Sequence, residues 1–574
     1  RRFRTATQWG VYELTVRDGA IVEVAGIDAD PSPAPMGDVL LDGVQHNTRI
    51  QRPAIRKSWL ERKDRGRERR GAEAFINVPW DEALELAANE LHRVKESYGN
   101  KAIFAGSYGW ASAGRFHHAQ SQLHRFINLI GGCTRAMNSY STAAAQVILP
   151  HVVAPWSHME LHQTSWQDVI EHSDLVVAFG GLPLRNTQVA YGGITEHNSA
   201  RDMRQASERG VTFCNISPLQ EDMPGWLNAQ TLMPRPGTDV ALMLGLAYVL
   251  EHESLLDRGF LHSHCEGHAR FRDYLLGHSD GVAKTPEWAA QLADVDAAAL
   301  VQLARRMAAE RTFITAAWSL QRADHGEQPY WMVVTLAAML GQIGMPGGGF
   351  GFGYAAEGFI GSNHRRFNWA TLSKGRNPAA FALPVARLAD TLLNRASDIE
   401  YDGEKITYPD TRLIYWAGGN PFHHHQDLNR LVRAWRKPDT VIVNEPWWTP
   451  TAQWADIVFP ATTAQERQDL CASSHDNYAH FMEQALPVQG QARSDHEIFA
   501  GLAAQLGIYD AFTEGRSERQ WLQKLWQDSQ LRAVEQGFEL PDFEQFVGAG
   551  QYKLPPRDRR EYWLADFRAD PQGH

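Results

Sequence analysis

The feature that most constrains this chain is a series of short apolar runs, each ending in Gly, Asn, Ser or Pro and alternating with amphipathic stretches. Four examples are "SDLVVAFGGLPL" (173–184), "RTFITAAWSLQ" (311–321), "TRLIYWAGGNPF" (411–422) and "DTVIVNEPWW" (439–448). Such runs are typical of central strands in a parallel sheet. Ligands of open α/β sheets bind beyond the carboxyl ends of the strands, so the polar residues after each run are candidates for a site.

The alternation falls into two groups, one before and one after "GQIGMPGGGFGFG" (341–353), and predicts an α/β protein with two parallel-sheet domains. A chain of 574 residues has room for about three or four domains. We expect the following division: an N-terminal β element at 1–52, a first α/β domain at 53–165 and 376–505, a second at 166–375, and a helical tail at 506–574.

Four local patterns add detail. The opening residues alternate like strands joined at Asp18-Gly19, and residues 80–99 have the apolar spacing of an amphipathic helix. The basic stretch at 56–71 is predicted to be a solvated loop or helix face rather than a nucleic-acid patch. "GGGFGFGYAA" (347–356) resembles a dinucleotide fingerprint, but it does not stand between a strand and a helix, so we expect a turn or flexible loop there.

Composition excludes several classes of function. The residues are 43% hydrophobic and 21% charged, an ordinary globular balance, and the net charge of −11 argues against nucleic acid as the main partner. The four cysteines are scattered without a CxxC spacing, so neither a local iron–sulfur cluster nor a disulfide framework is indicated. The adjacent histidines of "NPFHHHQD" (420–427) do not have the spacing with which helical pairs converge on zinc. We read no transmembrane segment.

The segment "NSYSTAAAQVILPHV" (138–152) places Ser139 and Ser141 at the start of an apolar helix. A Ser side chain there can cap the helix by accepting a backbone N–H bond. Alternatively, one of the two hydroxyl groups takes part in chemistry. The residues of this segment alone leave both interpretations open.

Five loops that follow predicted strands or helices are rich in Asn, Ser, Asp, Arg and Gln. They are "NISPLQED" (215–222), "RPGTDVA" (235–241), "WSLQRADHGEQ" (318–328), "GGNPFHHHQD" (418–427) and "ADIVFPATTAQERQD" (455–469). Any one of them could be an ordinary polar loop. Together they indicate an extended polar ligand with phosphates and a base, because Arg and backbone N–H groups hold phosphate and a carboxylate can accept from a guanine edge.

Six colinear segments resemble a known family. They are residues 107–132, 138–152, 235–245, 316–351, 416–431 and 448–463. These segments look like the dimethyl sulfoxide reductase family of molybdenum enzymes, and most like its biotin sulfoxide, trimethylamine N-oxide and dimethyl sulfoxide reductases, which lack iron–sulfur clusters. The likeness covers nearly the whole chain in order.

The resemblance implies one molybdenum held by two molybdopterin guanine dinucleotides and by a serine oxygen. By the "YSTAAAQ" motif that serine is Ser141, which leaves Ser139 to cap the helix or to make a hydrogen bond beside the metal ligand. In "SYGW", Tyr108 and Trp110 are expected to donate hydrogen bonds to the substrate oxygen. A tyrosine at this position accompanies S-oxide reducers in the family, which favours a sulfoxide over an amine N-oxide.

The same resemblance assigns residues to the two dinucleotides. One set is Arg185, Asn186, Ser217, Pro218, Asp239, Trp318, Ser319, Gln321 and Arg322. The other set is Gly419, Asn420, His424, Gln426, Glu445 and Asp456. Gln220 stands where relatives often carry Arg, which removes one expected phosphate contact.

The expected activity is reduction of an S-oxide, of the biotin sulfoxide or methionine sulfoxide type, in the cytoplasm with NADPH or a small redox protein as electron donor. The first alternative is a periplasmic respiratory dimethyl sulfoxide or trimethylamine N-oxide reductase with a cytochrome donor, if an upstream export signal was removed. The second is an inactive, truncated nucleotide-binding scaffold. Family members continue past "FRADPQGH" (567–574) into a β-rich domain, so we expect that C-terminal domain to be missing here. We expect this sequence to be a fragment, rather than a protein that holds its cofactor with one face uncovered.

Overall fold

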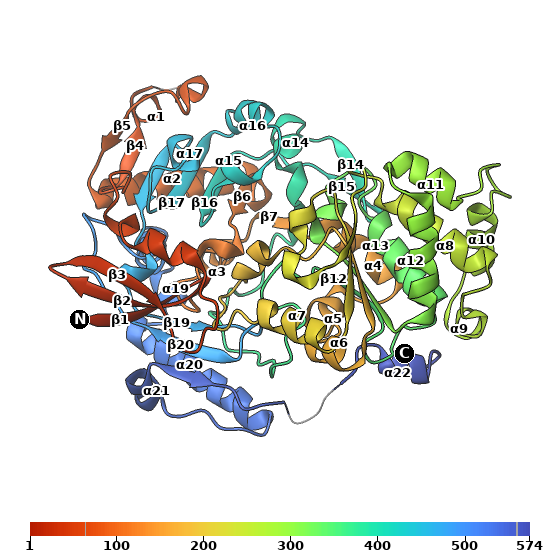
Figure 1. Ribbon diagram of the computed structural model, residues 1–574. Helices are drawn as coiled ribbons and strands as arrows, with labels where there is room; N and C mark the ends of the chain where they lie inside the picture. The colour runs from red at the N-terminus through yellow and green to blue at the C-terminus, as the bar shows by residue number, and fades with distance from the viewer. Residues whose placement is uncertain (63–64, 558–560) are drawn as a thin grey trace. The chain divides into compact units, whose positions relative to one another are not determined.

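The computed structural model describes residues 1–62, 65–557 and 561–574, and Figure 1 shows its helices and strands. The chain forms two compact units. Unit 1 comprises Arg1–Asn138, Tyr191–Glu196 and Arg366–Pro555, and unit 2 comprises Ser139–Ala190, His197–Arg365 and Pro556–His574. Each unit is thus built from segments that are far apart in the sequence. The domain limits expected above remain a prediction.

Unit 1 begins with a three-stranded antiparallel sheet made of β1 (Arg2–Thr7), β2 (Gly10–Arg17) and β3 (Ala20–Gly26). The chain turns between β2 and β3 at Asp18 and Gly19, which both have positive φ, at 51° and 76°. Two successive left-handed residues are what a tight hairpin turn requires. The N-terminal β element and its Asp-Gly turn are therefore confirmed.

The main sheet of unit 1 has eight strands in the order β13-β7-β6-β16-β17-β18-β4-β5. The first six run parallel, and β4 and β5 add an antiparallel edge. The strands are β13 (Phe381–Pro384), β7 (Thr134–Met137), β6 (Ile103–Gly106), β16 (Leu413–Ala417), β17 (Thr440–Glu445), β18 (Ile457–Pro460), β4 (Ala54–Arg56) and β5 (Phe75–Asn77). Every residue of β6, β16, β17 and β18 is buried, and the apolar runs at 411–422 and 439–448 predicted this for β16 and β17.

Helices bury both faces of this sheet. The amphipathic helix expected at 80–99 is α2 (Trp80–Tyr98), which packs with α3 (Ala119–Leu129) and α18 (Asp495–Gln505) in one apolar cluster. A second cluster includes residues of α14 (Leu388–Leu393) and α16 (Leu428–Trp435). The tail adds α19 (Tyr509–Thr513), α20 (Glu518–Glu535) and α21 (Phe543–Ala549). Unit 1 also contains the sheet β19-β20-β21 (Asp469–Ala472, Tyr478–Met482, Gln551–Lys553) and the hairpin of β14 (Asp398–Tyr401) and β15 (Glu404–Thr407).

The basic stretch at 56–71 is not simply a solvated surface. Arg56 and Arg70 are fully buried, and both pair with Asp456. The prediction of a solvated loop or helix face is therefore wrong for these two residues, because their partner lies far along the chain and cannot be read from the local sequence. Residues 63–64 of the stretch lie outside the described residues.

Unit 2 contains a five-stranded parallel sheet in the order β10-β9-β8-β11-β12. Its strands are β10 (Gln230–Leu232), β9 (Thr212–Ile216), β8 (Leu175–Phe179), β11 (Thr312–Ala316) and β12 (Gly349–Phe352). The expectation of a loop at 347–356 is wrong over β12. A Cβ at Gly351 would lie 2.4 Å from the Tyr354 ring, so glycine lets this strand pass close to packed aromatic side chains.

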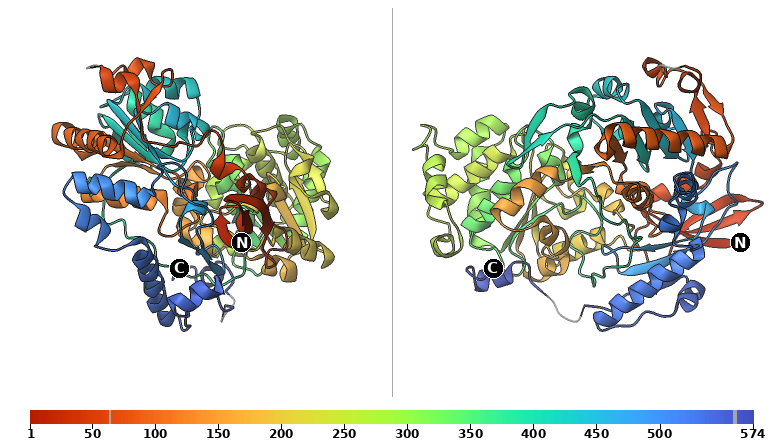
Figure 2. Two further views of the ribbon diagram at one scale, coloured as in Figure 1. Left: turned by 90° about the vertical axis from the view of Figure 1, so that its left-hand side faces the viewer. Right: turned by 180° about the vertical axis from the view of Figure 1, so that it is seen from behind.

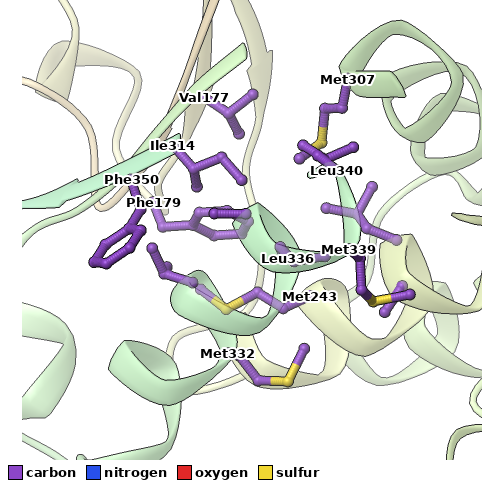
Figure 3. Packing of buried hydrophobic residues seen from close by; sticks show 14 of the residues in the cluster. Val177, Phe179, Met243, Met307, Ile314, Met332, Leu336, Met339, Leu340 and Phe350 are labelled. Atoms are coloured by element: carbon purple, nitrogen blue, oxygen red, sulfur yellow. The ribbon is translucent and has the colours of Figure 1, made fainter. Parts of the chain in front are cut away.

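The core of unit 2 lies between its sheet and helices. Figure 3 shows Val177 and Phe179 of the sheet beside Met243 and Leu336 of the helices. The helices are α8 (Asp239–His252), α11 (Pro286–Ala293), α12 (Ala297–Ala309) and α13 (Gln328–Met339). Figure 1 labels α8, α11 and α12 within a group of green helices, and the same green group is seen from two other sides in Figure 2. No helix among the described residues has both the length and the apolar character needed to cross a bilayer.

The strand side chains that face this core are Val177 and Phe179 of β8, Ile314 of β11 and Phe350 of β12 (Figure 3). Opposite them lie Met243 of α8, Met332, Leu336 and Met339 of α13, and Leu340, which follows α13 directly. The unbranched methionines adapt to irregular spaces between a twisted sheet and its helices. The α/β class with parallel sheets is therefore confirmed, and the buried sheets provide rigid supports for the polar segments that follow their strands.

Candidate functional site

The carboxyl ends of four neighbouring strands in unit 2 carry most of the first predicted set of residues. Parallel strands end at the same edge of a sheet, so these segments lie along one edge. Arg185 and Asn186 follow β8 in the 3-10 helix η6 (Leu184–Gln188), and Ser217 and Pro218 follow β9. Asp239 follows β10 at the start of α8. Trp318, Ser319, Gln321 and Arg322 follow β11, the first three in the 3-10 helix η9 (Trp318–Gln321).

Asp222 organises this edge and was missed by the sequence reasoning. Its carboxylate accepts from the Ser217 hydroxyl at 2.7 Å and pairs with the Arg185 guanidinium. Its backbone oxygen accepts from Leu182 N–H at 2.6 Å. The side chain of Arg185 remains 58% exposed, so its charge is held at the edge and still faces outward. The only signal for Asp222 was its place at the end of the polar run 215–222.

Two further polar groups belong to the same edge. Asn215, in β9, is fully buried, and its Oδ1 has no hydrogen-bond partner among the described residues. Asp239 is half-buried at the first turn of α8, and its burial raises its pKa above the ordinary value. A buried acceptor without a donor is costly unless a ligand or water satisfies it. The sequence reasoning named Ser217 and Pro218 in this motif but not Asn215.

The residues after β11 separate into two kinds. Ser319 and Arg322 are exposed, whereas Trp318 and Gln321 are buried. A Cβ at Gly353 would lie 2.0 Å from Trp318 Nε1, so the indole packs closely over that glycine. Gln321 bonds to the segment that contains Ser141. Within the protein, Trp318 and Gln321 therefore serve packing and loop geometry, and Ser319 and Arg322 are the accessible members.

Ser141 lies two residues before α4 (Ala143–Val152) in unit 2. The hydrogen bonds found among the described residues of this segment do not use its hydroxyl. The expectation that Ser139 caps the helix is wrong. Thr142 is the N-cap, it makes no side-chain cap bond, and the Ser139 hydroxyl instead lies 3.2 Å from Thr142 Oγ1. The backbone N–H of Ala144 is satisfied by Gln321 Oε1 at 2.8 Å.

In unit 1, Tyr108 follows the carboxyl end of β6 and is held by the neighbouring strand β16. Its backbone N–H donates to Gly418 O at 3.0 Å. Its ring lies edge-on to Trp416 and His424, with centroid distances of 5.1 and 4.8 Å. A Cβ at Gly419 would lie 2.3 Å from the Tyr108 ring, so this position needs glycine both for space and for its φ of 90°.

Trp110 lies in the next turn, η5 (Gly109–Ala111), and is 40% exposed. Its ring is 6.2 Å from that of Tyr191, which in turn lies 4.1 Å from the ring of His475. His118 supports the turn, since its Nε2 donates to Gly109 O at 3.1 Å. Tyr191 and His475 were not predicted, because neither stands in a motif near Trp110 in the sequence.

The segment after β16 contains four predicted residues, Gly419, Asn420, His424 and Gln426. Asn420 precedes α15 (Pro421–His424), and its Oδ1 accepts from the Thr451 hydroxyl at 2.5 Å. His424 and Gln426 are exposed. Partial desolvation of the His424 ring lowers its pKa, and the neighbouring His423 adds to the shift, which favours the neutral imidazole. These side chains are available at the carboxyl edge of the sheet.

Glu445 is the last residue of β17 and is buried at the same edge. Burial raises the pKa of Glu445 to about 8, while bonds from Trp447 N–H and the Thr449 hydroxyl oppose the shift. A neutral carboxylic acid can donate as well as accept a hydrogen bond. Glu445 can therefore donate or accept a hydrogen bond. Because it is buried, it would reach a polar ligand only through neighbouring residues or after a small movement.

Asp456 lies at the opposite edge, since it precedes β18 rather than following a strand. It is fully buried and accepts bonds from Arg56 Nε at 2.8 Å, from Arg70 Nη2 at 2.6 Å and from Val441 N–H at 2.8 Å. The structure thus does not bring Asp456 together with the other predicted residues. Its carboxylate is fully used in holding β4, β17 and β18 at their shared edge.

Comparison with known proteins now gives the family. Residues 49–505 match the molybdopterin oxidoreductase family, and residues 5–44 match the molybdopterin oxidoreductase N-terminal domain. The chain belongs to the molybdopterin oxidoreductase family. Membership implies a molybdenum–pterin cofactor and oxidoreductase chemistry.

Curated relatives of this molybdopterin oxidoreductase match nearly the whole chain. The biotin sulfoxide reductase of Cereibacter sphaeroides is 43% identical over 95% of this chain and 73% of its own length. The dimethyl sulfoxide/trimethylamine N-oxide reductase of the same organism is 41% identical over 98% and 70%. The trimethylamine-N-oxide reductase of Haemophilus influenzae is 39% identical over 99% and 70%.

A solved structure shares the fold. The acetylene hydratase of Pelobacter acetylenicus superposes with a TM-score of 0.67 over 97% of this chain and 75% of that protein, at 18% sequence identity. At this identity the likeness concerns the fold alone.

The residues at the carboxyl edge of the unit 2 sheet fit a molybdenum–pterin cofactor. In unit 2, Arg185, Ser217 and the unsatisfied Asn215 oxygen form a polar, partly cationic set of the kind that holds phosphates and bases. The unused Ser141 hydroxyl is a hard oxygen donor, which suits a high-valent, oxophilic metal. Among the described residues, no group of three or more His, Cys, Asp or Glu side chains could by itself hold a metal ion.

Proposed function

We propose that this molybdopterin oxidoreductase reduces an S-oxide, of the biotin sulfoxide or methionine sulfoxide type, to the thioether. One S-oxide, two electrons and two protons give one thioether and one water. When bound, the molybdenum–pterin cofactor supplies the two-electron oxygen-atom transfer. The names of relatives that are 39% to 43% identical support this choice, since they reduce S-oxides or N-oxides.

The observation that carries the proposal is the close packing around the Tyr108 ring. Its ring is held against Trp416 and His424 and over Gly419, so the phenol has little freedom to move. A rigidly held O–H group can donate to the S-oxide oxygen and stabilise the charge that develops as the S–O bond breaks. The indole N–H of Trp110 would act as a second donor.

Ser141 is the protein ligand that we assign to molybdenum. Its hydroxyl oxygen is not used in the hydrogen bonds of its own segment, in contrast to that of Ser139, which pairs with Thr142. On deprotonation it would supply an anionic oxygen to the metal, and the scattered cysteines agree with a site that needs no protein thiolate.

The cofactor would take the form of two molybdopterin guanine dinucleotides, without an iron–sulfur cluster. In unit 2, one dinucleotide would be held by the buried Ser217 and by the exposed or partly exposed members of the first set, which are Arg185, Asn186, Pro218, Asp239, Ser319 and Arg322. In unit 1, the other would be held by Gly419, Asn420, His424, Gln426 and Glu445. We do not carry Asp456 into this set, because its carboxylate is fully bonded at the other edge.

The electron donor and the location follow from which subgroup the chain joins. NADPH or a small redox protein would serve a cytoplasmic enzyme, and a cytochrome would serve the alternative, a periplasmic dimethyl sulfoxide or trimethylamine N-oxide reductase. The relatives named for dimethyl sulfoxide and trimethylamine N-oxide support that second candidate.

The test uses the full chain purified from a molybdenum-replete host. We expect one mole of molybdenum and two moles of guanine nucleotide per mole of protein. In assays of a panel of S-oxides and N-oxides with reduced viologen as electron donor, we expect faster turnover of the S-oxides. Protein without molybdenum or pterin would instead be the inactive scaffold. Faster turnover of trimethylamine N-oxide than of every S-oxide would favour the respiratory alternative.

Variants test the metal ligand. Ser141→Ala should lose turnover completely, because the metal loses its protein oxygen, whereas Ser139→Ala should retain most of it. Equal losses in the two variants would contradict the assignment of Ser141.

A further inference from the structure

The start of α4 depends on a side chain from another part of unit 2. The helix begins at Ala143, and its N-cap residue Thr142 makes no side-chain bond to the exposed N–H groups. The first N–H groups of a helix have no partner within the helix and need one from elsewhere. Ala143 N–H donates to Ser139 O at 3.0 Å, and Ala144 N–H donates to Gln321 Oε1 at 2.8 Å.

Gln321 also bonds to the other side of the same turn. Its Nε2 donates to the backbone oxygen of Ser141, with a longer contact of 3.5 Å to that of Tyr140. A single amide therefore links the residues on both sides of the Ser141–Ala144 turn. Gln321 is itself 9% exposed and lies in η9, just after the interior strand β11. The turn is tied to the rigid sheet through this one side chain.

We propose that Gln321 is a positioning residue that sets the orientation of the Ser141 hydroxyl. The inference rests on the proposed role of Ser141 as the metal ligand. It also changes the role expected for Gln321, which the family resemblance assigns to a dinucleotide. Both hydrogens of its amide face backbone oxygens, and one lone pair of Oε1 is taken by Ala144, so at most one acceptor position remains for a ligand.

Unit 2 contains a matched control at the other end of the same strand. Gln342 Oε1 accepts from Thr312 N–H at 2.8 Å, and its Nε2 donates to Glu310 O at 2.9 Å. It is also 9% exposed. Gln321 and Gln342 thus make the same pair of bonds, at the carboxyl and amino ends of β11, but only Gln321 touches the Ser141 segment.

The experiment compares Gln321→Leu with Gln342→Leu in the full-length holoenzyme. Both variants should lower the melting temperature, since each leaves a buried or partly buried N–H and a partly buried carbonyl without partners. Only Gln321→Leu should alter the electron paramagnetic resonance signal of one-electron-reduced molybdenum. It should also speed hydrogen exchange in the peptide containing residues 140–146 and lower kcat at least tenfold with little change in KM.

Gln321→Glu separates the two bonds. It keeps an acceptor for Ala144 N–H but has no hydrogen for Ser141 O when ionised, so we expect an altered resonance signal with less increase in exchange than in Gln321→Leu. A signal and kcat equal to those of the unmodified enzyme in Gln321→Leu would overturn the proposal and leave Gln321 a purely structural residue. Loss of guanine nucleotide with an unchanged signal in the remaining holoenzyme would also overturn it, in favour of a dinucleotide contact.

A separate variant distinguishes failure of this inference from failure of the proposed function. If Ser141→Ala leaves the resonance signal unchanged, Ser141 is not the ligand and the proposed function loses its metal site, whatever Gln321 does. If Ser141→Ala changes the signal and Gln321→Leu does not, only the positioning role is wrong.

Discussion

The two edges of the main sheet in unit 1 use polar residues in opposite ways. At the amino edge, Asp456 is buried between Arg56 and Arg70, and Glu90 is bonded to Arg65 and to Arg93. At the carboxyl edge, Tyr108 and His424 lie against each other beside a glycine turn, and buried Glu445 lacks an ion pair among the described residues. One edge is closed by compensated charges, and the other presents side chains that a ligand can use.

This contrast shows that the end of the strand at which a polar residue lies, rather than its residue type, separates structural from functional polar groups. Asp456 and Glu445 are both acidic, both buried and both next to a β-strand of the same sheet. Asp456 precedes its strand and Glu445 ends one. In a parallel sheet that difference places them at opposite edges, and ligands bind at the carboxyl edge.

The largest effect that would test the contrast is on stability. Asp456→Ala leaves the buried guanidinium groups of Arg56 and Arg70 without their shared carboxylate. Breaking a buried ion pair on one side costs about 3–5 kcal/mol. We expect a loss of that size in the free energy of unfolding, measured by urea titration, with normal guanine nucleotide content in the protein that remains folded.

A control for this prediction is Asp410→Ala, which removes a 41% exposed carboxylate paired with Arg412 on the surface. Exposed pairs contribute about 0–1 kcal/mol, so the change should be small. Specific loss of guanine nucleotide from Asp456→Ala, without loss of stability, would return Asp456 to the cofactor-binding set.

Local sequence predicted the strands well and the partners of polar residues poorly. The apolar runs at β8, β11, β16 and β17 were recognisable because burial on both faces demands continuous apolar sequence. The partners were not, since Arg56 and Asp456 are 400 residues apart. Strand β12 was missed because its glycines are typical of a turn, and only the packed rings beside Gly351 explain them.

The candidate site shows the same limit. The strand-end motifs predicted that polar residues gather after β8, β9, β10 and β11, and unit 2 places them at one edge. The ion pair of Asp222 with Arg185 and the contacts of Gln321 with the Ser141 segment depend on how separate loops meet, so no local pattern specified them. The roles of the individual site residues stay predictions.

The next effect concerns the carboxyl edge. Gly419→Ala should displace Tyr108, because the new Cβ would lie 2.3 Å from its ring. Losing a correctly placed hydrogen-bond donor to a developing charge lowers kcat by roughly a hundredfold. We expect a fall of about tenfold to a hundredfold in kcat for S-oxides, measured with reduced viologen, with normal molybdenum content.

Gly403→Ala is the matched control for backbone strain. Gly403 also has a positive φ, at 76°, but no atom lies within 4 Å of its Cβ position. Both variants should therefore lose similar stability from backbone strain, and only Gly419→Ala should lose activity. Equal activity in the two variants would separate Tyr108 from the reaction.

The smallest expected effect is the change in unfolding free energy from one pH unit to the next. It is also the most direct test of the difference between the two edges. Burial raises the pKa of Glu445 from its ordinary value of 4.5 to about 8, so the folded protein holds this proton over a range where the unfolded chain has released it. Its contribution to stability is complete below pH 4.5 and is lost as the pH rises to about 8. Burial alone would also raise the pKa of Glu90, but bonds from Arg65 and Arg93 lower it to about 2.

The Glu90 contribution therefore has the opposite sign. It is complete above pH 4.5 and is lost as the pH falls towards 2. Relative to Glu445→Gln, the free energy of unfolding of the unmodified protein should fall by up to about 1.4 kcal/mol per pH unit as the pH rises from about 5 to 8. Relative to Glu90→Gln, it should fall only on acidification. Urea titrations at each pH measure both differences. If the two differences had the same sign, the amino edge would not be the compensated one, and the distinction between a structural and a ligand-binding edge would have to rest on geometry alone.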